Sequence, residues 1–187
     1  MDNKIRVRFA PSPTGPLPIG GLRTALFNYL FAKKNNGDFL VRIEDTDQAR
    51  YVPGSEQHIL DSLSWCGINP DEGPESGGEH GPYRQSERGC VYEEYISILI
   101  SKGGAYYAFD SKEELEKERK LCEKEGETFI YNASNRLKFK NSLSLSSKKT
   151  KELIEKQDYV IRFKTPEKAE ITCYDVLRGK ILVDSHV

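Results

Sequence analysis

The sequence lacks the features of a membrane protein or of a protein from an oxidising compartment. None of its apolar runs is long enough to span a bilayer, and its first residues, MDNKIRVRF, contain no apolar signal-peptide core. Its four cysteines, Cys66, Cys90, Cys122 and Cys173, are far apart without paired spacing, which disfavours disulfides and a metal site. We therefore expect a cytoplasmic protein that does not enter a membrane.

An excess of charge of one sign is also missing. Charged residues make up 30% of the 187 residues and the formal net charge is −1. This balance argues neither for nor against a nucleic-acid partner, because a basic face can lie on a neutral protein. The sequence has no internal repeat and neither of two common phosphate-binding signatures, G-x-x-x-x-G-K-S/T and G-x-G-x-x-G. Its length allows one large domain or two small ones.

Strand-like and helix-like patterns alternate over the first part of the chain. Residues 5–10 and 39–43 read as strands, and residues 20–34 and 55–66 have the apolar spacing of helices. This order predicts a parallel sheet with right-handed crossovers.

The composition then changes. Residues 69–82 are rich in Gly, Pro, Asp and Glu, which indicates a loop or a domain boundary. Three predicted helices (86–102, 111–125 and 143–156) and three predicted strands (159–164, 171–176 and 180–184) follow. Ser111 and Glu114 have the spacing of a capping box. The later part of the chain is therefore expected to be an α+β region.

The connection between the first strand and the first helix is a candidate anion site. Pro11 and Pro13 stiffen the turn, and Gly20 and Gly21 let the backbone approach a ligand at the start of the helix. Free backbone N–H groups and the helix dipole favour a phosphate there. The alternative is an ordinary strand-to-helix connection.

Two charged residues, Arg8 and Glu44, form a second candidate for ligand binding. Arg8 lies toward the end of the first predicted strand, and Glu44 lies at the end of the second. Ligands of open α/β sheets lie beyond the carboxyl ends of the strands, and an arginine with a carboxylate would suit an amino-acid substrate. The alternative is a surface salt bridge combined with a helix cap.

Several segments together resemble the glutamyl-tRNA synthetases of the bacterial type. They are RFAPSPTG at 8–15, IGG at 19–21, RTALFNY at 23–29, VRIEDTD at 41–47, RYVPG at 50–54 and GPYRQSER at 81–88. The resemblance covers nearly the whole chain and is strongest over 5–107. The related glutaminyl enzymes differ at the Pro-rich turn and at the Glu-Asp-Thr-Asp stretch.

The resemblance implies an α/β fold: the first half of a class I Rossmann-like catalytic domain (1–81), with an inserted α+β acceptor-stem-binding domain (82–187). It also implies that the chain is the N-terminal part of a larger enzyme. The second Rossmann half, a Lys-Met-Ser-Lys-Ser-like ATP loop and an anticodon-binding region are expected outside it. The full-length enzyme is expected to be a monomer, and the 187 residues alone are expected to be inactive.

The implied activity joins glutamate to the 3′ end of tRNA(Glu) through a glutamyl-adenylate, with ATP and Mg²⁺. The family's functional positions fall on three sets of residues: Arg8, Ala10, Ser12 and Glu44 for glutamate; the signature positions Pro18, Ile19, Gly20 and Gly21 against ATP; and Asp47 and Arg50 near the terminal adenosine of the tRNA. Arg8 would pair with the side-chain carboxylate of glutamate and Glu44 with its ammonium.

The sequence departs from the family at two places. Pro18 stands where the family usually has the first histidine of its signature, so a side-chain donor to ATP phosphates is missing. The positions that match a Cys-x-Cys…Tyr…Cys zinc site are Ala108, Asp110, Tyr131 and Asn135. Without a thiolate they predict no zinc. His58 and His80 have no partner at metal spacing and are expected in surface or loop positions.

Two alternatives stay open at this stage. A paralogue that glutamylates a modified base, glutamyl-queuosine tRNA(Asp) synthetase, shares the Pro-rich turn. A non-catalytic tRNA-binding module would explain Pro18, and lysines at 138, 140, 148, 149 and 151 would then meet an acceptor stem, although charge runs are usually solvated faces.

Overall fold

The computed structural model describes residues 4–156, 158–176 and 178–185. They form two compact units, Met1–Tyr92 and Glu93–Val187. The first unit thus includes residues 82–92, which follow the boundary at Gly81 that the resemblance implies. No helix of the described residues is long and apolar enough to cross a membrane.

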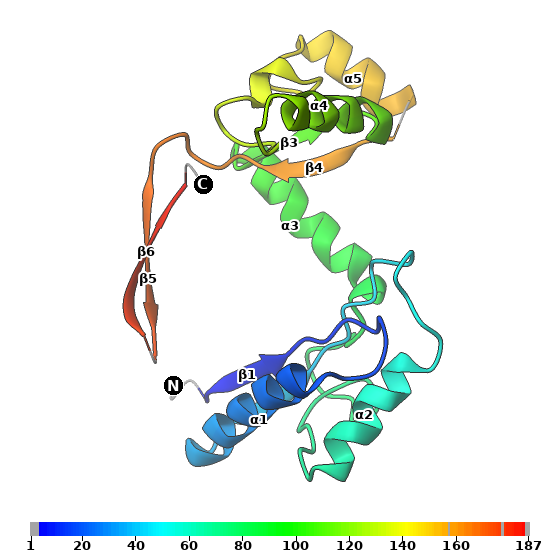
Figure 1. The fold of residues 1–187 in the computed structure, drawn as a ribbon, viewed down its shortest axis with the longest axis vertical. Coiled ribbons are helices and arrows are strands. Elements are labelled where there is room, and N and C mark those ends of the chain that lie inside the picture. The colour runs from blue at the N-terminus through cyan, green and yellow to red at the C-terminus, as the bar shows by residue number, and fades with distance from the viewer. Residues whose placement is uncertain (1–3, 157, 177, 186–187) are drawn as a thin grey trace. The chain divides into compact units, whose positions relative to one another are not determined.

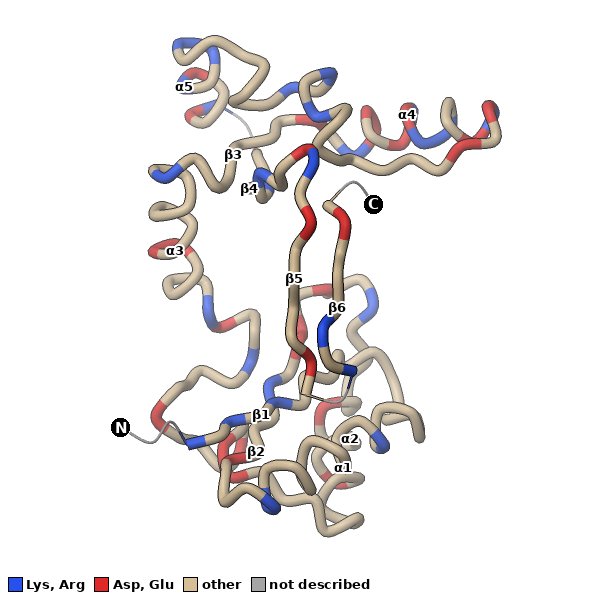
Figure 2. The backbone as a smooth tube through the Cα atoms, turned by 90° about the vertical axis from the view of Figure 1, so that its left-hand side faces the viewer, with Lys and Arg blue, Asp and Glu red and all other residues tan. Residues whose placement is uncertain are grey.

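The first unit has the predicted β-α-β-α order (Figures 1 and 2). Its elements are β1 (Arg6–Phe9), α1 (Ile19–Lys34), β2 (Asp38–Val41) and α2 (Ser55–Trp65). The two strands are parallel and in register from Arg6↔Asp38 to Phe9↔Val41. Because parallel strands end at the same edge, the segments after Phe9 and Val41 emerge side by side.

Apolar side chains from both helices and both strands make the core of this unit. The buried set consists of Phe9, Ala25, Ala32, Phe39, Val41, Ile43, Ile59, Leu63 and Ile68. The small residues Ala25 and Ala32 are the buried positions of α1, and Ile59 and Leu63 lie one turn apart on α2. This packing fixes the edge of the sheet at which the candidate residues Arg8 and Glu44 lie.

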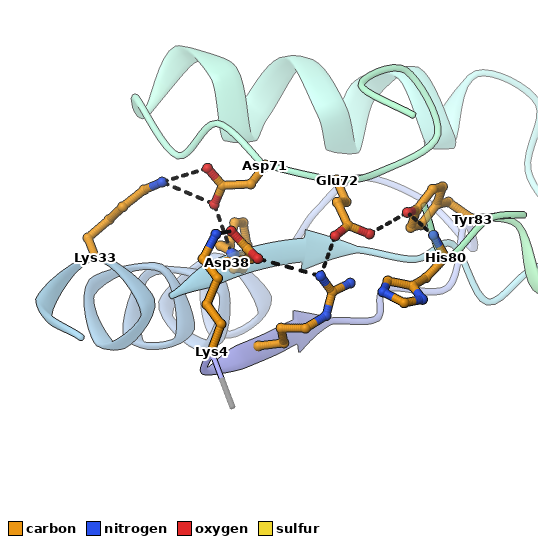
Figure 3. A network of polar contacts seen from close by, with 9 residues as sticks. Lys4, Lys33, Asp38, Asp71, Glu72, His80 and Tyr83 are labelled. Carbon is orange, nitrogen blue, oxygen red and sulfur yellow. Dashed lines mark hydrogen bonds and ion pairs between the residues drawn. The ribbon is translucent and has the colours of Figure 1, made fainter. Parts of the chain in front are cut away.

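The predicted loop at 69–82 contributes to the sheet. Leu40 and Glu72 form a parallel bridge, and the backbone N–H of Val41 donates to the carbonyl oxygen of Glu72 at 3.0 Å. Beside it, the Arg6 guanidinium binds the Glu72 carboxylate at 2.5 Å and the Tyr83 hydroxyl donates to the same carboxylate, as Figure 3 shows for Glu72 and Tyr83. This network ties the loop to both strands.

The second unit is an α+β arrangement. The 3₁₀ segment Gln85–Arg88 leads into α3 (Gly89–Ser101), and α3 continues into this unit. The elements that follow are β3 (Ala105–Ala108), α4 (Lys112–Lys124), a second 3₁₀ segment (Arg136–Lys138), α5 (Ser147–Lys156), β4 (Val160–Phe163), β5 (Glu170–Asp175) and β6 (Gly179–Asp184). β3 pairs with β4 and β5 with β6, both antiparallel. Figure 2 shows acidic and basic residues close together along α4. The predicted capping box is confirmed at the start of α4, where Ser111 and Glu114 exchange both hydrogen bonds.

An aromatic and polar cluster lies inside the second unit. The Tyr131 ring stacks on Phe139 with centroids 4.5 Å apart, and Cζ of Arg162 lies 4.0 Å from the Tyr131 centroid. The fully buried Asn141 amide donates to the Tyr131 hydroxyl at 3.2 Å. Burial raises the pKa of Tyr131 to about 12, because the charged phenolate is disfavoured away from water.

Candidate active site

Arg8 and Glu44 meet at the carboxyl ends of the paired strands. Nη2 of Arg8 lies 3.9 Å from Oε1 of Glu44, and Nη2 of Arg42 approaches the same oxygen at 3.1 Å. The Arg8 and Glu44 side chains keep 45% and 33% of their surface exposed, so a small ligand has access to both charges. The juxtaposition expected from strand ends is thus present, whereas the contribution of Arg42 was not foreseen.

The Pro-rich turn is fixed against the segment that follows β2. The N–H of Glu44 donates to the carbonyl oxygen of Pro11 at 2.9 Å, and the N–H of Val52 donates to that of Pro13 at 3.0 Å. Pro11 and Pro13 are buried, while Ala10 is half-buried and Ser12 is exposed on the same turn. The turn that carries Ala10 and Ser12 is therefore held by backbone hydrogen bonds to the segment that contains Glu44.

The N-terminus of α1 has the electrostatics of an anion site. Pro18 is its N-cap residue, with φ −75° and ψ 155° and no side-chain capping bond. The first intrahelical bond runs from the N–H of Leu22 to the carbonyl oxygen of Pro18, so the N–H groups at positions 19–21 have no acceptor within the helix. The first turn has no acidic residue to offset the positive end of the dipole.

The two glycines of this turn have different surroundings. A Cβ built on Gly20 would meet nothing within 4 Å, whereas one on Gly21 would lie 3.0 Å from Cδ1 of Leu17. Gly20 therefore leaves space in front of the helix, as expected for close approach of a ligand. Gly21 serves the packing of Leu17 instead.

His58 lies on α2 close to this turn. It is exposed, as predicted, and the N–H of Leu17 donates to its Nδ1 at 3.4 Å. Leu17 directly precedes Pro18, the N-cap residue of α1, so its hydrogen bond to His58 holds the chain at the start of this helix. Sequence spacing gave no sign of this contact.

Asp47 and Arg50 form a local ion pair. Nε of Arg50 lies 2.6 Å from Oδ2 of Asp47, and the side chains are 70% and 45% exposed. The hydrogen bond from Arg50 holds the pKa of the Asp47 carboxyl below its usual value. Both predicted residues of this set are thus adjacent and accessible to a large partner.

Asp45 is a buried carboxylate that no sequence motif singled out as functional. It is 9% exposed, and it accepts hydrogen bonds from the Ser86 N–H at 2.9 Å and from the Ser86 hydroxyl at 2.6 Å. Burial acts to raise the pKa of Asp45, but the bonds from Ser86 outweigh it, so the pKa lies below its usual value. Asp45 is therefore an anion under physiological conditions.

The positions that match the family's zinc site carry other contacts. Oδ1 of Asp110 accepts the N–H of Lys140 at 2.9 Å, and the Asn135 amide donates to the carbonyl oxygen of Ile130 at 2.7 Å. Tyr131 belongs to the stack described above, and Ala108 is buried in β3. Among the described residues, no three His, Cys, Asp or Glu side chains are grouped in a way that would hold a metal ion.

Comparison with known proteins shows which family the chain belongs to. The chain is 57% identical to the glutamate–tRNA ligase of Christiangramia forsetii and 54% identical to that of Flavobacterium psychrophilum, in each case over its whole length. It covers 37% and 38% of those two relatives. A crystal structure of a glutamate tRNA ligase from Elizabethkingia meningosepticum, in complex with its amino acid, superposes with a TM-score of 0.91 at 52% identity over 98% of this chain and 37% of that one. The family profile of the catalytic domain of class I tRNA synthetases (E and Q) matches residues 4–187, and the chain belongs to this family.

Proposed function

We propose that this chain forms the N-terminal part of the catalytic domain of an ATP-dependent glutamate–tRNA ligase. The observation that carries the proposal is the pairing of Arg8 with Glu44 at the strand ends, in the same unit as the uncapped N-terminus of α1. The relatives are glutamate–tRNA ligases, and the chain spans 37–38% of their length. The remaining parts of the active site are proposed to come from the rest of a longer protein.

Glutamate is proposed to separate the two charges of this pair. Its side-chain carboxylate would replace Glu44 as the partner of the Arg8 guanidinium, which can grip a carboxylate with two hydrogen bonds. Its ammonium would bind the Glu44 carboxylate. Arg42, at 3.1 Å from Glu44, would hold that carboxylate in place while the ligand exchanges with Arg8. Ala10 and Ser12 would line the turn side of the ligand.

ATP is proposed to place its phosphates at the start of α1. The N–H groups of Ile19, Gly20 and Gly21 and the dipole would attract them, and Gly20 would leave the room they need. Mg²⁺ would accompany ATP and offset phosphate charge as the reaction proceeds. Pro18 offers neither a side-chain donor nor an N–H, so the backbone must supply the stabilisation on this side.

The proposed reaction requires that the two reactants be positioned, and it needs no general base. The α-carboxylate of glutamate is ionised at neutral pH and is already the nucleophile that attacks the α-phosphate. A new carboxyl–phosphate bond forms and pyrophosphate leaves. Residues of this chain would bring the two reactants together and stabilise the charge that develops at phosphorus.

Asp47, Arg50 and the second unit are proposed to take part in the transfer of glutamate to tRNA(Glu). Asp47 and Arg50 would open their ion pair toward the terminal adenosine, and the second unit would bind the acceptor stem. Two of its candidate lysines already have acidic partners, because Lys140 contacts Glu114 and Lys149 contacts Glu152. The proposal also includes a cytoplasmic location and a monomeric full-length protein.

Glutamate-dependent ATP–pyrophosphate exchange in the presence of tRNA tests the proposal. The full-length protein is expected to exchange with glutamate, E44Q is expected to lose the activity, and E79Q, on an exposed loop glutamate, is expected to keep it. Salt-dependent tRNA binding without any glutamate-dependent exchange would overturn the ligase proposal in favour of a binding module. Exchange by the 187 residues alone would overturn the need for further chain.

A further inference from the structure

The position of Glu44 depends on what holds the irregular segment after β2. On one side the segment is bonded to the first strand and its turn: the N–H of Arg42 donates to Phe9 at 3.1 Å and the N–H of Glu44 donates to Pro11 at 2.9 Å. These backbone bonds fix the side of Glu44 that faces β1. They do not fix the chain beyond it.

On the other side the segment is bonded to residues 83–86. The N–H of Ile43 donates to Tyr83 and the N–H of Gln85 donates to Ile43, both at 2.9 Å. The next residue after Glu44 adds a side-chain contact, because the Asp45 carboxylate takes both the N–H and the hydroxyl of Ser86. Glu44 therefore lies between two lines of hydrogen bonds, and the Asp45–Ser86 contact closes the second.

Ser86 occupies a special place in the backbone. It belongs to the 3₁₀ segment Gln85–Arg88, which runs directly into α3 (Gly89–Ser101). The first N–H groups of a helical run have no partner within it, and the N-cap residue Arg84 makes no side-chain capping bond. The Asp45 carboxylate thus caps this helical run from a different part of the chain, where its charge also complements the dipole.

We propose that Asp45 and Ser86 are positioning residues for the reaction. Their contact fixes the backbone on which Glu44 faces the ligand ammonium and from which the chain continues to Asp47, and it joins that backbone to the start of α3. Neither residue touches a substrate in this role, which rests on the proposed ligase function. Loss of the contact should act first on glutamate and on transfer to tRNA, and not on the ATP site at α1.

The test compares variants of the full-length protein in ATP–pyrophosphate exchange and in aminoacylation. S86A removes the hydroxyl bond, and D45N removes the charge at nearly constant size. Each is expected to raise the KM for glutamate by about tenfold, because a displaced Glu44 binds the ligand ammonium less well, while the KM for ATP stays within about twofold. S86T, which restores a hydroxyl, is expected to return the KM for glutamate to the value of the unaltered protein.

D71N provides the matched control. Asp71 is also a carboxylate that accepts a backbone N–H, from Phe39 at 2.8 Å, but it lies at the opposite end of β2. D71N is expected to lower the melting temperature of the protein without changing the KM for glutamate. An unchanged KM in S86A, an equal change in D71N, or no recovery in S86T would each overturn the positioning role. An unaltered protein without glutamate-dependent exchange would instead overturn the ligase function, and this role with it.

Discussion

The Arg8 guanidinium lies 3.9 Å from Oε1 of Glu44, at the edge of the sheet where both strands end. This separation is longer than a direct hydrogen bond, and Arg42 is closer to the same oxygen at 3.1 Å. Glu44 is therefore held mainly by Arg42, while Arg8 keeps donors available. An arrangement of this kind can accept a zwitterionic ligand without first breaking a strong ion pair.

Replacement of Arg8 by lysine should weaken glutamate binding. Lysine keeps the charge but cannot make the two parallel hydrogen bonds that a guanidinium makes to a carboxylate. We expect R8K to raise the KM for glutamate by about tenfold with little change in the KM for ATP. Kinetics of glutamate-dependent exchange in the full-length protein measure both.

Arg6 offers the control on the same strand. It lies two residues earlier and binds Glu72 at 2.5 Å, so R6K should affect the stability of the first unit and not the KM for glutamate. Equal KM changes in R6K and R8K would contradict a specific contact between Arg8 and glutamate.

Restoration of a histidine at Pro18 should raise the rate of adenylate formation. The imidazole would add a donor at the uncapped start of α1, where negative charge develops on the phosphates. One such donor contributes on the order of 100-fold in rate. We expect P18H to increase the rate of glutamate-dependent exchange by up to that factor, and P16H, at an exposed proline of the same turn, to leave it unchanged. Equal rates in P18H and the unaltered protein would show that the signature histidine is dispensable here.

Local patterns predicted most of the fold. Helices α1, α2 and α4 were visible in the spacing of apolar residues and in caps such as Ser111–Glu114, because these signals depend on neighbours in the chain. β3 was missed, since Ala-Tyr-Tyr-Ala does not alternate and becomes a strand by pairing with β4. The bridge from Leu40 to Glu72 was missed for the same reason, because a Gly- and Pro-rich segment carries no strand pattern of its own.

In the candidate site, too, some contacts were predicted from the sequence and others were not. Arg8 and Glu44 were predicted to be neighbours because both follow from one rule about the ends of parallel strands. The bond between Asp45 and Ser86 joins residues 41 positions apart, and nothing in either local sequence indicates it. The different roles of Gly20 and Gly21 also depend on Leu17, whose side chain reaches only one of them.

The two glycines at the start of α1 should respond differently to alanine. G20A places a methyl group in open space, so we expect unchanged stability and a KM for ATP raised by about tenfold. G21A presses on Cδ1 of Leu17, the end of a flexible side chain that can shift, so we expect a small loss of stability and a smaller effect on ATP. Exchange kinetics and thermal unfolding separate the two outcomes, and an unchanged KM in G20A would place the phosphates elsewhere.

Tyr131 should make the second unit sensitive to alkaline pH. Its pKa is raised from 10.0 to about 12, mainly by burial, so both the folded and the unfolded states are protonated below pH 10. As the pH rises from 10.0 toward about 12, the unfolded state loses the proton while the folded state keeps it, and the free energy of unfolding must fall. Urea unfolding at a series of pH values should show this slope in the unaltered protein and a shallower slope in Y131F, because burial also raises the pKa of Tyr83. Y131F should also be less stable by about 1 kcal/mol at neutral pH, because the bond from Asn141 is lost. Y174F, at a tyrosine that is 78% exposed, should retain the full slope, and an equal slope in Y131F and the unaltered protein would show that other groups control alkaline unfolding.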